Sequence, residues 1–231
     1  MSSPSRGEPA IALTLRVDSE HAVSALLDAP PQRPRAGFVF AHGAGAGMAH
    51  PFMSAVARAL VARGVATLRY QFPYMEQRSK RPDRPPLAHA AVRAAVDAAA
   101  RDLPGVPLIA GGKSFGGRMT SQAQALAPLP GVAGLAFLGF PLHPPGKPAD
   151  ERATHLADVR VPMLFLQGSR DELADLALLR PVVTRLASRA TLEVFDDADH
   201  SFHVRARSGR RDAEVLGDVV DRLVAWIDRV T

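Results

Sequence analysis

The stretch Val106-Pro-Leu-Ile-Ala-Gly-Gly-Lys-Ser-Phe-Gly-Gly-Arg118 decides the fold class of this chain. Its first five residues are apolar enough for a short buried strand, and a helix-like segment begins at Arg118. Between them, Gly112-Lys-Ser-Phe-Gly116 fits the pattern Gly-x-Ser-x-Gly, in which a serine projects from a sharp strand-to-helix turn. Such a turn strains the backbone, and bulky side chains two positions before or after the serine would collide across it. The stretch therefore predicts a strand, a tight turn that presents Ser114 as a nucleophile, and a helix.

Two other interpretations of the glycines fail when positions are counted. A Walker A phosphate loop needs glycine at position 107, where Pro107 stands. A dinucleotide-binding fingerprint that starts at Gly43 needs glycine at position 48, where Met48 stands. One alternative stays open, a glycine-rich turn in which Ser114 only caps the following helix.

Short apolar segments alternate with amphipathic segments from residue 37 onward, after a predicted hairpin at 11–17 and 21–28. This alternation is typical of βαβ units, in which helices cover both faces of a parallel sheet, so the sequence predicts the α/β class. The expected strands are 38–41, 65–68, 106–110, 135–138, 163–166 and 192–195. The expected helices are 52–63, 87–101, 118–126, 173–187 and 212–230.

A base and an acid for Ser114 are expected after later strands. Loops that leave the carboxyl ends of parallel strands converge on one edge of the sheet. A serine hydroxyl becomes a good nucleophile when a base, held in one tautomer by a third group, takes its proton. Asp171 and His200 follow the last two expected strands, so we predict that His200 moves the proton and Asp171 orients His200. Glu172 and Asp175 are the rival acids.

Two backbone N–H groups are expected to bind a developing oxyanion. Phe115 follows Ser114 at a helix N-terminus, where unpaired N–H groups and the helix dipole favour negative charge. Ala44 lies in the loop His42-Gly-Ala44, directly after the strand at 38–41. We predict that the N–H groups of Ala44 and Phe115 are the donors and that His42 braces its loop. A flexible glycine loop without a ligand is the alternative.

Metal or cofactor chemistry is not expected. The stretch Asp199-His200-Ser-Phe-His203 suggests a pair of metal ligands, but further ligands at matching spacing are missing from the sequence. The chain has no cysteine, which excludes disulfides, thiolate metal sites and a cysteine nucleophile.

The loop motifs resemble one branch of the α/β-hydrolase superfamily. They are His42-Gly-Ala-Gly45, Gly111-Gly-Lys-Ser-Phe-Gly-Gly-Arg118, Phe140-Pro-Leu-His-Pro-Pro145, Gly168-Ser-Arg-Asp-Glu172 and Asp199-His-Ser-Phe202, and the likeness runs from about residue 38 to the C-terminus. The branch contains bacterial hydrolases, a testis-expressed animal protein and the hydrolase-like subunit of an animal chromatin-modifying complex. The resemblance implies an α/β-hydrolase fold and a triad in the chain order Ser, Asp, His. Dienelactone hydrolases are similar in size but have a cysteine where Ser114 stands.

The residues and the resemblance together predict an esterase-like serine hydrolase that acts on a carboxylic ester or related acyl compound. A non-catalytic binding or scaffold module, and an acyltransferase with the same triad, are the alternatives. Few residues separate the strands at 135–138 and 163–166, so we expect an open site with little or no cap. His143 could contact a substrate or bond to backbone within its proline-rich turn. The candidates for lining the site, or alternatively for ordinary packing, are Phe72, Tyr74, Met75, Leu142, His143 and Phe202.

Composition limits the class of protein and its partners. An apolar fraction of 47% and a charged fraction of 22% predict a single globular domain at 10–231 after a flexible tail at 1–9. The net charge of +5 comes from dispersed arginines, and the densest cluster, 78–84, has no interleaved aromatic residues, so nucleic-acid binding is not expected. No apolar run is long enough for a membrane span or follows Met1 as in a signal peptide. We expect a cytoplasmic protein whose partner is a small acyl substrate, and the sequence does not predict the oligomeric state.

Overall fold

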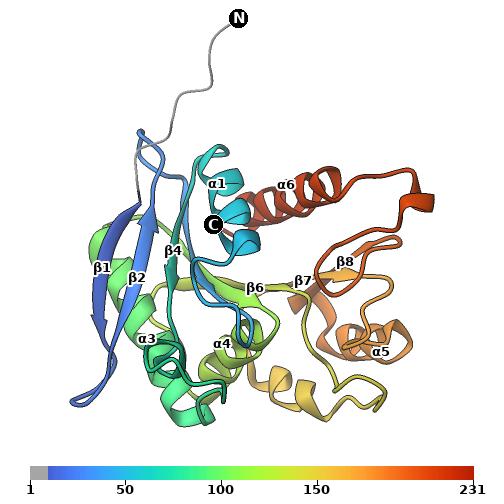
Figure 1. Cartoon of the computed structure of the whole chain (residues 1–231), viewed down its shortest axis with the longest axis horizontal. Helices are drawn as coiled ribbons and strands as arrows, with labels where there is room; N and C mark the ends of the chain where they lie inside the picture. The colour runs from blue at the N-terminus through green and yellow to red at the C-terminus, as the bar shows by residue number, and fades with distance from the viewer. Residues whose placement is uncertain (1–9) are drawn as a thin grey trace, which may run out of the picture.

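The computed structural model describes residues 10–231, and its centre is an eight-stranded sheet in the order β1-β2-β4-β3-β5-β6-β7-β8 (Figure 1). β3 to β8 run parallel, whereas β1 and β2 form an antiparallel hairpin, and β2 pairs antiparallel with β4. The strands are β1 (Ile11–Arg16), β2 (Ala22–Asp28), β3 (Ala36–Ala41), β4 (Val65–Tyr70), β5 (Leu108–Lys113), β6 (Val132–Leu138), β7 (Met163–Gly168) and β8 (Ala190–Phe195). The tail predicted at residues 1–9 lies outside the described residues.

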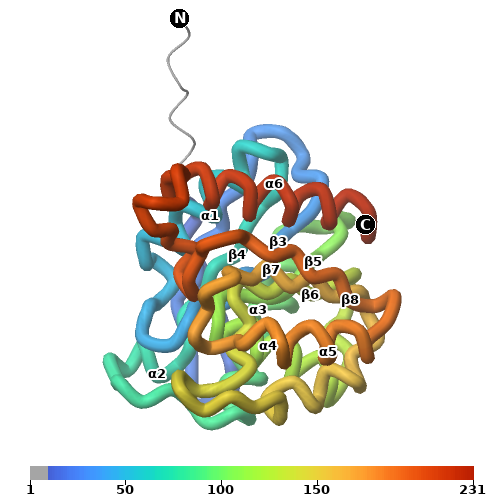
Figure 2. The backbone as a smooth tube through the Cα atoms, turned by 90° about the vertical axis from the view of Figure 1, so that its right-hand side faces the viewer, coloured from blue at the N-terminus to red at the C-terminus, as the bar shows by residue number. Residues whose placement is uncertain are grey.

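Helices cover both faces of the sheet. Figure 2 shows α1 and α6 on one side of the strands and α3, α4 and α5 on the other. The α-helices are α1 (Pro51–Val61), α2 (Pro73–Glu76), α3 (Pro85–Asp102), α4 (Phe115–Leu126), α5 (Leu176–Leu186) and α6 (Asp212–Val230). Short 3₁₀ helices are η1 (Glu151–Asp158), η2 (Ala187–Arg189) and η3 (Ala206–Ser208).

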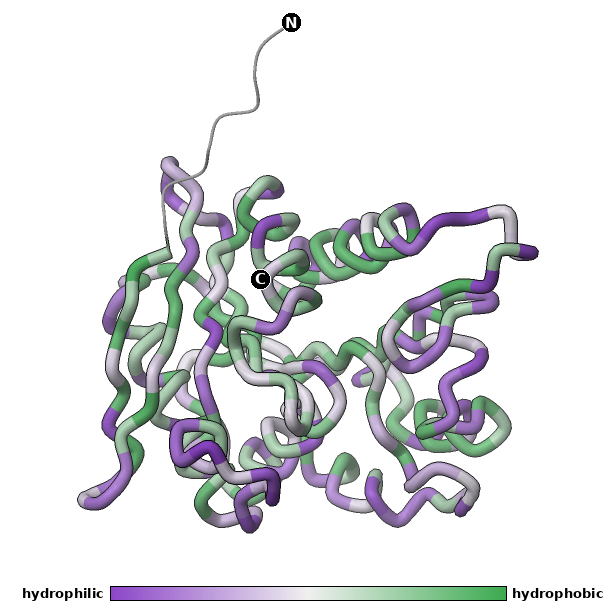
Figure 3. The backbone as a smooth tube through the Cα atoms, in the orientation of Figure 1, coloured by the Kyte–Doolittle hydropathy of each residue, from purple (hydrophilic) through white to green (hydrophobic). Residues whose placement is uncertain are grey.

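Each face of the sheet has its own hydrophobic core. Ala95 of α3 and Met119 of α4 belong to one core, and Leu60 of α1 and Trp226 of α6 belong to the other. Figure 3 shows apolar stretches along the strands and alternating apolar and polar bands along α6, as expected for a helix with one buried side. The buried residues of α6 are Val215, Val219, Val220, Leu223, Trp226 and Ile227. The α/β class predicted from the alternating pattern is confirmed, because both faces of the parallel strands are covered.

The strand before Ser114 differs from the prediction in its bounds. We expected residues 106–110, whereas β5 spans Leu108–Lys113 and includes Gly111 and Gly112, the first glycine of the motif. Pro107 has no N–H for the sheet ladder, and only its carbonyl pairs, with Gly37 N at 2.9 Å. The strand continues through Gly111, where only glycine fits, because a Cβ at this position would lie 1.9 Å from Ala136 O of β6. Glycine marks close approach of two strands here and not the end of the strand.

The connection between β6 and β7 carries no cap. Residues 139–162, all of them described, contain a single short helix, η1, which packs against α4. Neither η1 nor the four-residue α2 is among the expected helices, so both are additions to the predicted elements. Among residues 10–231, no helix combines the length and the apolar character that a membrane span requires.

Arg69 joins the hairpin to the rest of the sheet through a buried cluster of polar contacts. Its guanidinium donates to Asp28 Oδ2 at 2.8 and 3.2 Å, to Met48 O at 2.9 Å and to Ser54 Oγ at 3.0 Å. The side chain of Arg69 is 6% exposed and that of Asp28 is 17% exposed. Breaking a pair this deeply buried strongly lowers the free energy of unfolding, because removal of one partner leaves the other charge buried without a counter-charge.

We expect Arg69→Met to lower the free energy of unfolding by about 3 kcal/mol, because Asp28 is left unpaired. Urea unfolding measures the change. Arg35→Met is the matched control, since Arg35 pairs with Asp228 at 2.8 Å on the surface, and it should cost less than about 1 kcal/mol. If both substitutions lowered the free energy of unfolding by the same amount, burial of the pair would not explain the cost of losing Arg69.

Candidate active site

Ser114 lies in the turn between β5 and α4 with φ of 51° and ψ of −116°. A positive φ is rare for a residue with a side chain and costs roughly 1–3 kcal/mol. Two backbone hydrogen bonds hold the turn, from Ser114 N to Leu138 O at 3.2 Å and from Arg118 N to Ser114 O at 3.1 Å. The strained turn expected from the motif is present, and it places the half-buried serine at the carboxyl edge of the sheet.

The two motif glycines let this turn approach the end of β3. A Cβ on Gly112 would lie 2.4 Å from Ala41 O, and a Cβ on Gly116 would lie 2.6 Å from both Ala41 O and His42 O. We expected side chains at the glycine positions to collide across the turn itself. One such contact exists, because a Cβ on Gly112 would lie 2.9 Å from Gly117 N. The closer obstacle is the neighbouring strand, which the sequence motif alone does not reveal.

Asp171 and His200 meet at the same edge. His200 Nδ1 lies 2.7 Å from Asp171 Oδ2, and the carboxylate side chain is fully buried while the imidazole is 24% exposed. Because the carboxylate accepts this hydrogen bond, Nδ1 carries the proton in the neutral ring and Nε2 is left as the basic nitrogen. The residue pair therefore presents one imidazole nitrogen for proton transfer.

Asp171 is the carboxylate of the three candidates that bonds to His200. Its Oδ1 accepts from Leu173 N at 2.8 Å, and its Oδ2 also accepts from Gln167 Nε2 at 2.5 Å. Of the rivals, Glu172 is exposed, and Asp175 caps α5 by accepting from Ala177 N at 2.8 Å. Three donors thus fix the Asp171 carboxylate in one orientation.

The Ser114 turn and the His200 loop adjoin the same backbone at the end of β6. Ser114 N bonds to Leu138 O, and a Cβ on the next residue, Gly139, would lie 3.2 Å from both Cε1 and Nδ1 of His200. The preceding residue, Lys113, donates from Nζ to His200 O at 2.5 Å. Asp171 and His200 are thus in direct contact, and the turn of Ser114 adjoins the same backbone as the His200 ring. Proton transfer between Ser114 and His200 stays a prediction.

The loop after β3 lies beside the serine and is braced by His42. A Cβ on Gly43 would lie 3.7 Å from Ser114 Cβ. His42 Nε2 accepts from Phe72 N at 3.2 Å, so the proton is on Nδ1, which donates to Gly43 O at 2.8 Å. Burial lowers the pKa of His42 to about 4, and the bond to Gly43 O opposes this shift. The ring is therefore neutral and acts through its two hydrogen bonds, in agreement with the bracing role predicted for it.

Two N–H groups in the turns near Ser114 have no hydrogen-bond acceptor among residues 10–231. In the β3 loop, the N–H of Gly45 donates to Tyr74 Oη at 2.8 Å and that of Ala46 donates to Gly43 O, while Ala44 N–H has no such partner within residues 10–231. Phe115 N–H belongs to the first turn of α4, where no carbonyl within the helix can accept it. Binding of an oxyanion by these two groups stays a prediction.

Five of the six candidate pocket residues are buried, and several of them pack against other aromatic rings. The rings of Phe72 and Phe115 pack edge to face at 5.2 Å, and those of Phe202 and Phe52 stack at 6.1 Å. Met75 is half-buried, with its methyl group beside Gly47. The buried candidates are Phe72, Tyr74, Leu142, His143 and Phe202. Contact between any of them and a substrate stays a prediction.

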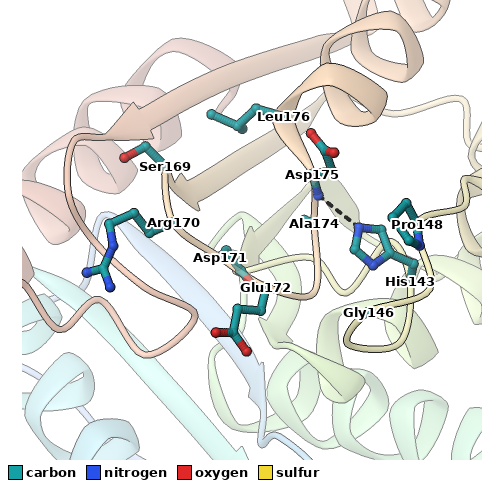
Figure 4. A pocket seen from close by; sticks show the side chains of 10 residues that line it. All are labelled: His143, Gly146, Pro148, Ser169, Arg170, Asp171, Glu172, Ala174, Asp175 and Leu176. Carbon is teal, nitrogen blue, oxygen red and sulfur yellow. Dashed lines mark hydrogen bonds between the residues drawn. The ribbon is translucent and has the colours of Figure 1, made fainter.

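His143 has both ring nitrogens occupied by backbone. Nδ1 lies 2.9 Å from Pro144 O, and Nε2 accepts from Asp175 N at 2.9 Å, the bond drawn in Figure 4. These bonds favour the structural alternative for His143. The ring forms part of the wall of a surface cavity of about 430 Å³ beside Asp171. Neither Ser114 nor His200 lines this cavity, so it gives no evidence for an acyl pocket.

Asp199 and His203 serve the turn that carries His200. Asp199 Oδ1 accepts from Ser201 N at 2.8 Å and from His203 N at 3.0 Å, and His203 Nδ1 bonds to Asp212 Oδ2 at 2.6 Å. Across residues 10–231, no group of three or more His, Asp or Glu side chains is arranged to hold a metal ion.

Comparison with known proteins agrees with this architecture. Residues 34–228 match the model of the alpha/beta hydrolase domain family. The chain belongs to this family. The serine hydrolase without a lid from Xanthomonas campestris has a TM-score of 0.72 at 21% identity, and the two chains are covered over 97% and 98% of their lengths. Dienelactone hydrolase from Anabaena variabilis has a TM-score of 0.76 at 22% identity, with 96% of this chain and 97% of that chain covered. For the esterase domain of a Rhodothermus marinus protein, the TM-score is 0.73 at 17% identity, with 95% and 98% covered.

Sequence reasoning missed two polar residues at the site of this α/β hydrolase. Gln167 links Asp171 to the next loop, because its Oε1 accepts from Phe140 N at 3.0 Å. Lys113 links the serine turn to His200. Both are buried polar residues at the end of an otherwise apolar strand. That position was the available signal, since a buried polar side chain needs a partner.

The pKa of His42 predicts how acid affects this hydrolase. Between pH 6.5 and about 4, the unfolded chain binds a proton at His42 that the folded chain does not bind, so stability is lost as the pH falls through this window. We expect this residue to account for a loss of about 2–3 kcal/mol between pH 7 and pH 4.5. Urea unfolding at the two pH values should show a smaller loss in His42→Gln than in the wild type. Identical losses in the two proteins would show that His42 is not the group responsible.

Proposed function

We propose that this protein is a serine hydrolase that cleaves a carboxylic ester or related acyl compound through an acyl-enzyme on Ser114. The observation that carries the proposal is the 2.7 Å hydrogen bond from His200 Nδ1 to the buried Asp171 carboxylate, beside a serine held at positive φ. Membership of the α/β-hydrolase family supports the general class of reaction. Relatives described as a serine hydrolase and an esterase domain support it at the level of fold.

The first half of the reaction forms the acyl-enzyme. Ser114 Oγ attacks the carbonyl carbon of the substrate while His200 Nε2 takes the hydroxyl proton. Asp171 stays ionised, keeps the ring in the required tautomer and stabilises the imidazolium. The oxygen of the tetrahedral intermediate is bound by the N–H groups of Ala44 and Phe115, the second of which has the dipole of α4 behind it. The intermediate then expels the alcohol, which receives the proton from His200.

The second half repeats the same steps with water. His200 Nε2 takes a proton from water, the hydroxide attacks the ester carbonyl of the acyl-enzyme, and Ser114 leaves with the proton returned by His200. An acyltransferase would replace water by another hydroxyl or amine at this step. The short η1 connection favours hydrolysis, because it leaves the serine turn without a cap that would exclude water.

We expect a fluorophosphonate probe to label the wild-type protein at Ser114, and Ser114→Ala to abolish both labelling and esterase activity. The physical reason is that the nucleophilic hydroxyl is removed while the turn is kept. Mass spectrometry of labelled peptides and a panel of ester and amide substrates measure the two effects. Ser201→Ala, which removes an exposed serine next to His200, is the matched control and should keep both. A wild-type protein that neither reacts with the probe nor turns over any substrate would instead fit a binding or scaffold module.

Asp171→Asn should lower kcat by up to about 10⁴-fold while the protein stays folded, because the amide no longer selects the His200 tautomer or stabilises its charge. Loss of the triad aspartate in a serine protease has an effect of this size. Glu172→Gln removes the same charge from the adjacent exposed residue and should change kcat less than about threefold. Steady-state kinetics on the best ester, with circular dichroism as a check of folding, compare the two. If Glu172→Gln is the crippled variant, the acid has been assigned to the wrong residue.

A further inference from the structure

Lys113 is a buried lysine in the residue position just before the nucleophile. It is the last residue of β5 and is 8% exposed. Its Nζ lies between two aromatic rings, 6.0 Å from the centroid of Phe52 in α1 and 5.9 Å from that of Phe202 in the loop after β8. Lysine is almost never fully buried unless it has a partner, so its position needs an explanation.

The partner of Lys113 is the backbone of His200. Nζ donates to His200 O at 2.5 Å, across the small gap left by Gly139. A Cβ on Gly139 would lie 3.0 Å from Lys113 Nζ and 3.2 Å from the His200 ring, so the ammonium and the imidazole are near neighbours. The titratable groups that face Nζ are Asp171, Asp199 and His200. A hydrogen bond from a charged donor is roughly twice as strong as one between neutral groups.

His200 is therefore held at two points. Asp171 fixes the ring through Nδ1, and Lys113 fixes the backbone through the carbonyl oxygen. The turn around His200 has strain of its own, because Phe202 has a φ of 61°. Lys113 precedes Ser114 in the chain, so its side chain links the serine turn directly to the histidine turn.

We propose that Lys113 is a positioning residue, whose ammonium ties the turn of His200 to the strand end of Ser114 and so sets the distance over which the proton passes between them. This inference rests on the function proposed above. A misplacement of about 1 Å between reacting groups can cost on the order of 10²-fold in rate. A methionine would fill the space of the lysine stem but could neither donate to His200 O nor carry charge.

The strength of the hydrogen bond from Lys113 Nζ to His200 O depends on pH, because it depends on the charge of the ammonium group. Burial lowers the pKa of Lys113 to about 8, and attraction to Asp171 and Asp199 opposes this shift. Above that pH the amine is neutral, its bond to His200 O is weaker and its attraction to the two carboxylates is lost. We therefore expect kcat of the wild type to fall severalfold between pH 7 and pH 9.5.

The first test compares Lys113→Met with the wild type on one ester substrate. We expect kcat to fall by at least about tenfold with KM nearly unchanged, and the fall in kcat above pH 8 to disappear. The Tm should not decrease, because a buried charge has been removed. Lys80→Met, at an exposed lysine, is the matched control and should behave as the wild type. Wild-type kcat in Lys113→Met would overturn the proposal, and so would a loss of kcat that parallels a loss of Tm.

The second test needs no substrate and so separates this inference from the proposed function. Hydrogen exchange of residues 198–204 should be faster in Lys113→Met than in the wild type, while exchange in α3 on the other face is unchanged. Lys113→Gln keeps a neutral donor and should give an intermediate rate. If the wild type shows no turnover but Lys113→Met still exchanges faster, the tie stands and the proposed function fails. Unchanged exchange in both variants would overturn the proposed link between Lys113 and the turn of His200. If neither variant folds, a wild-type kcat that does not change between pH 7 and pH 9.5 would overturn it.

Discussion

The close approach of the β5–α4 turn to the end of β3 is the constraint on which the site depends. Ser114 adopts its left-handed conformation where Gly112 and Gly116 lie against Ala41 and His42, at distances that admit no Cβ. The same contact brings the N-terminus of α4 beside the loop that follows β3. One packing requirement thereby places the serine, both free N–H groups and the braced His42 within a single layer at the edge of the sheet.

Buried polar groups extend this layer toward β7 and β8. Gln167, Asp171 and Lys113 are all buried, and each makes hydrogen bonds to a neighbouring loop. Satisfied polar networks in a low-dielectric interior specify one arrangement of side chains, whereas a partly satisfied network is costly. Rigid positioning of His200 therefore comes from polar contacts, while the two apolar cores hold the sheet beneath it.

The fold class was predictable because the spacing of apolar residues follows which side of a helix or strand is buried. The helix α6, for example, has the bounds that the sequence predicted. The placement of Asp171 and His200 at one edge followed from the rule that parallel strands end together. The extra length of β5 was not predictable, because glycine reads as a turn signal when the neighbouring strands are unknown. The roles of Gln167 and Lys113 were not predictable for a related reason. A polar side chain at the end of a strand can be assigned a role once its hydrogen-bond partner in a neighbouring loop is known. Burial of Phe72 and Leu142 depended on packing between loops, which carries no periodic signal.

The short η1 connection has a consequence for how such a site exchanges material with solvent. Enzymes closed by a mobile lid pass through an opening step on each cycle, and that motion frequently limits turnover. Here the segment between β6 and β7 packs against α4 and no such element is present in residues 139–162. For the proposed reaction, substrate arrival and product release therefore need no opening of this segment. In that reaction, discrimination between substrates then rests on the loops after β3, β4 and β6, which hydrogen bonds from Phe72 N to His42 and from Phe140 N to Gln167 hold in place.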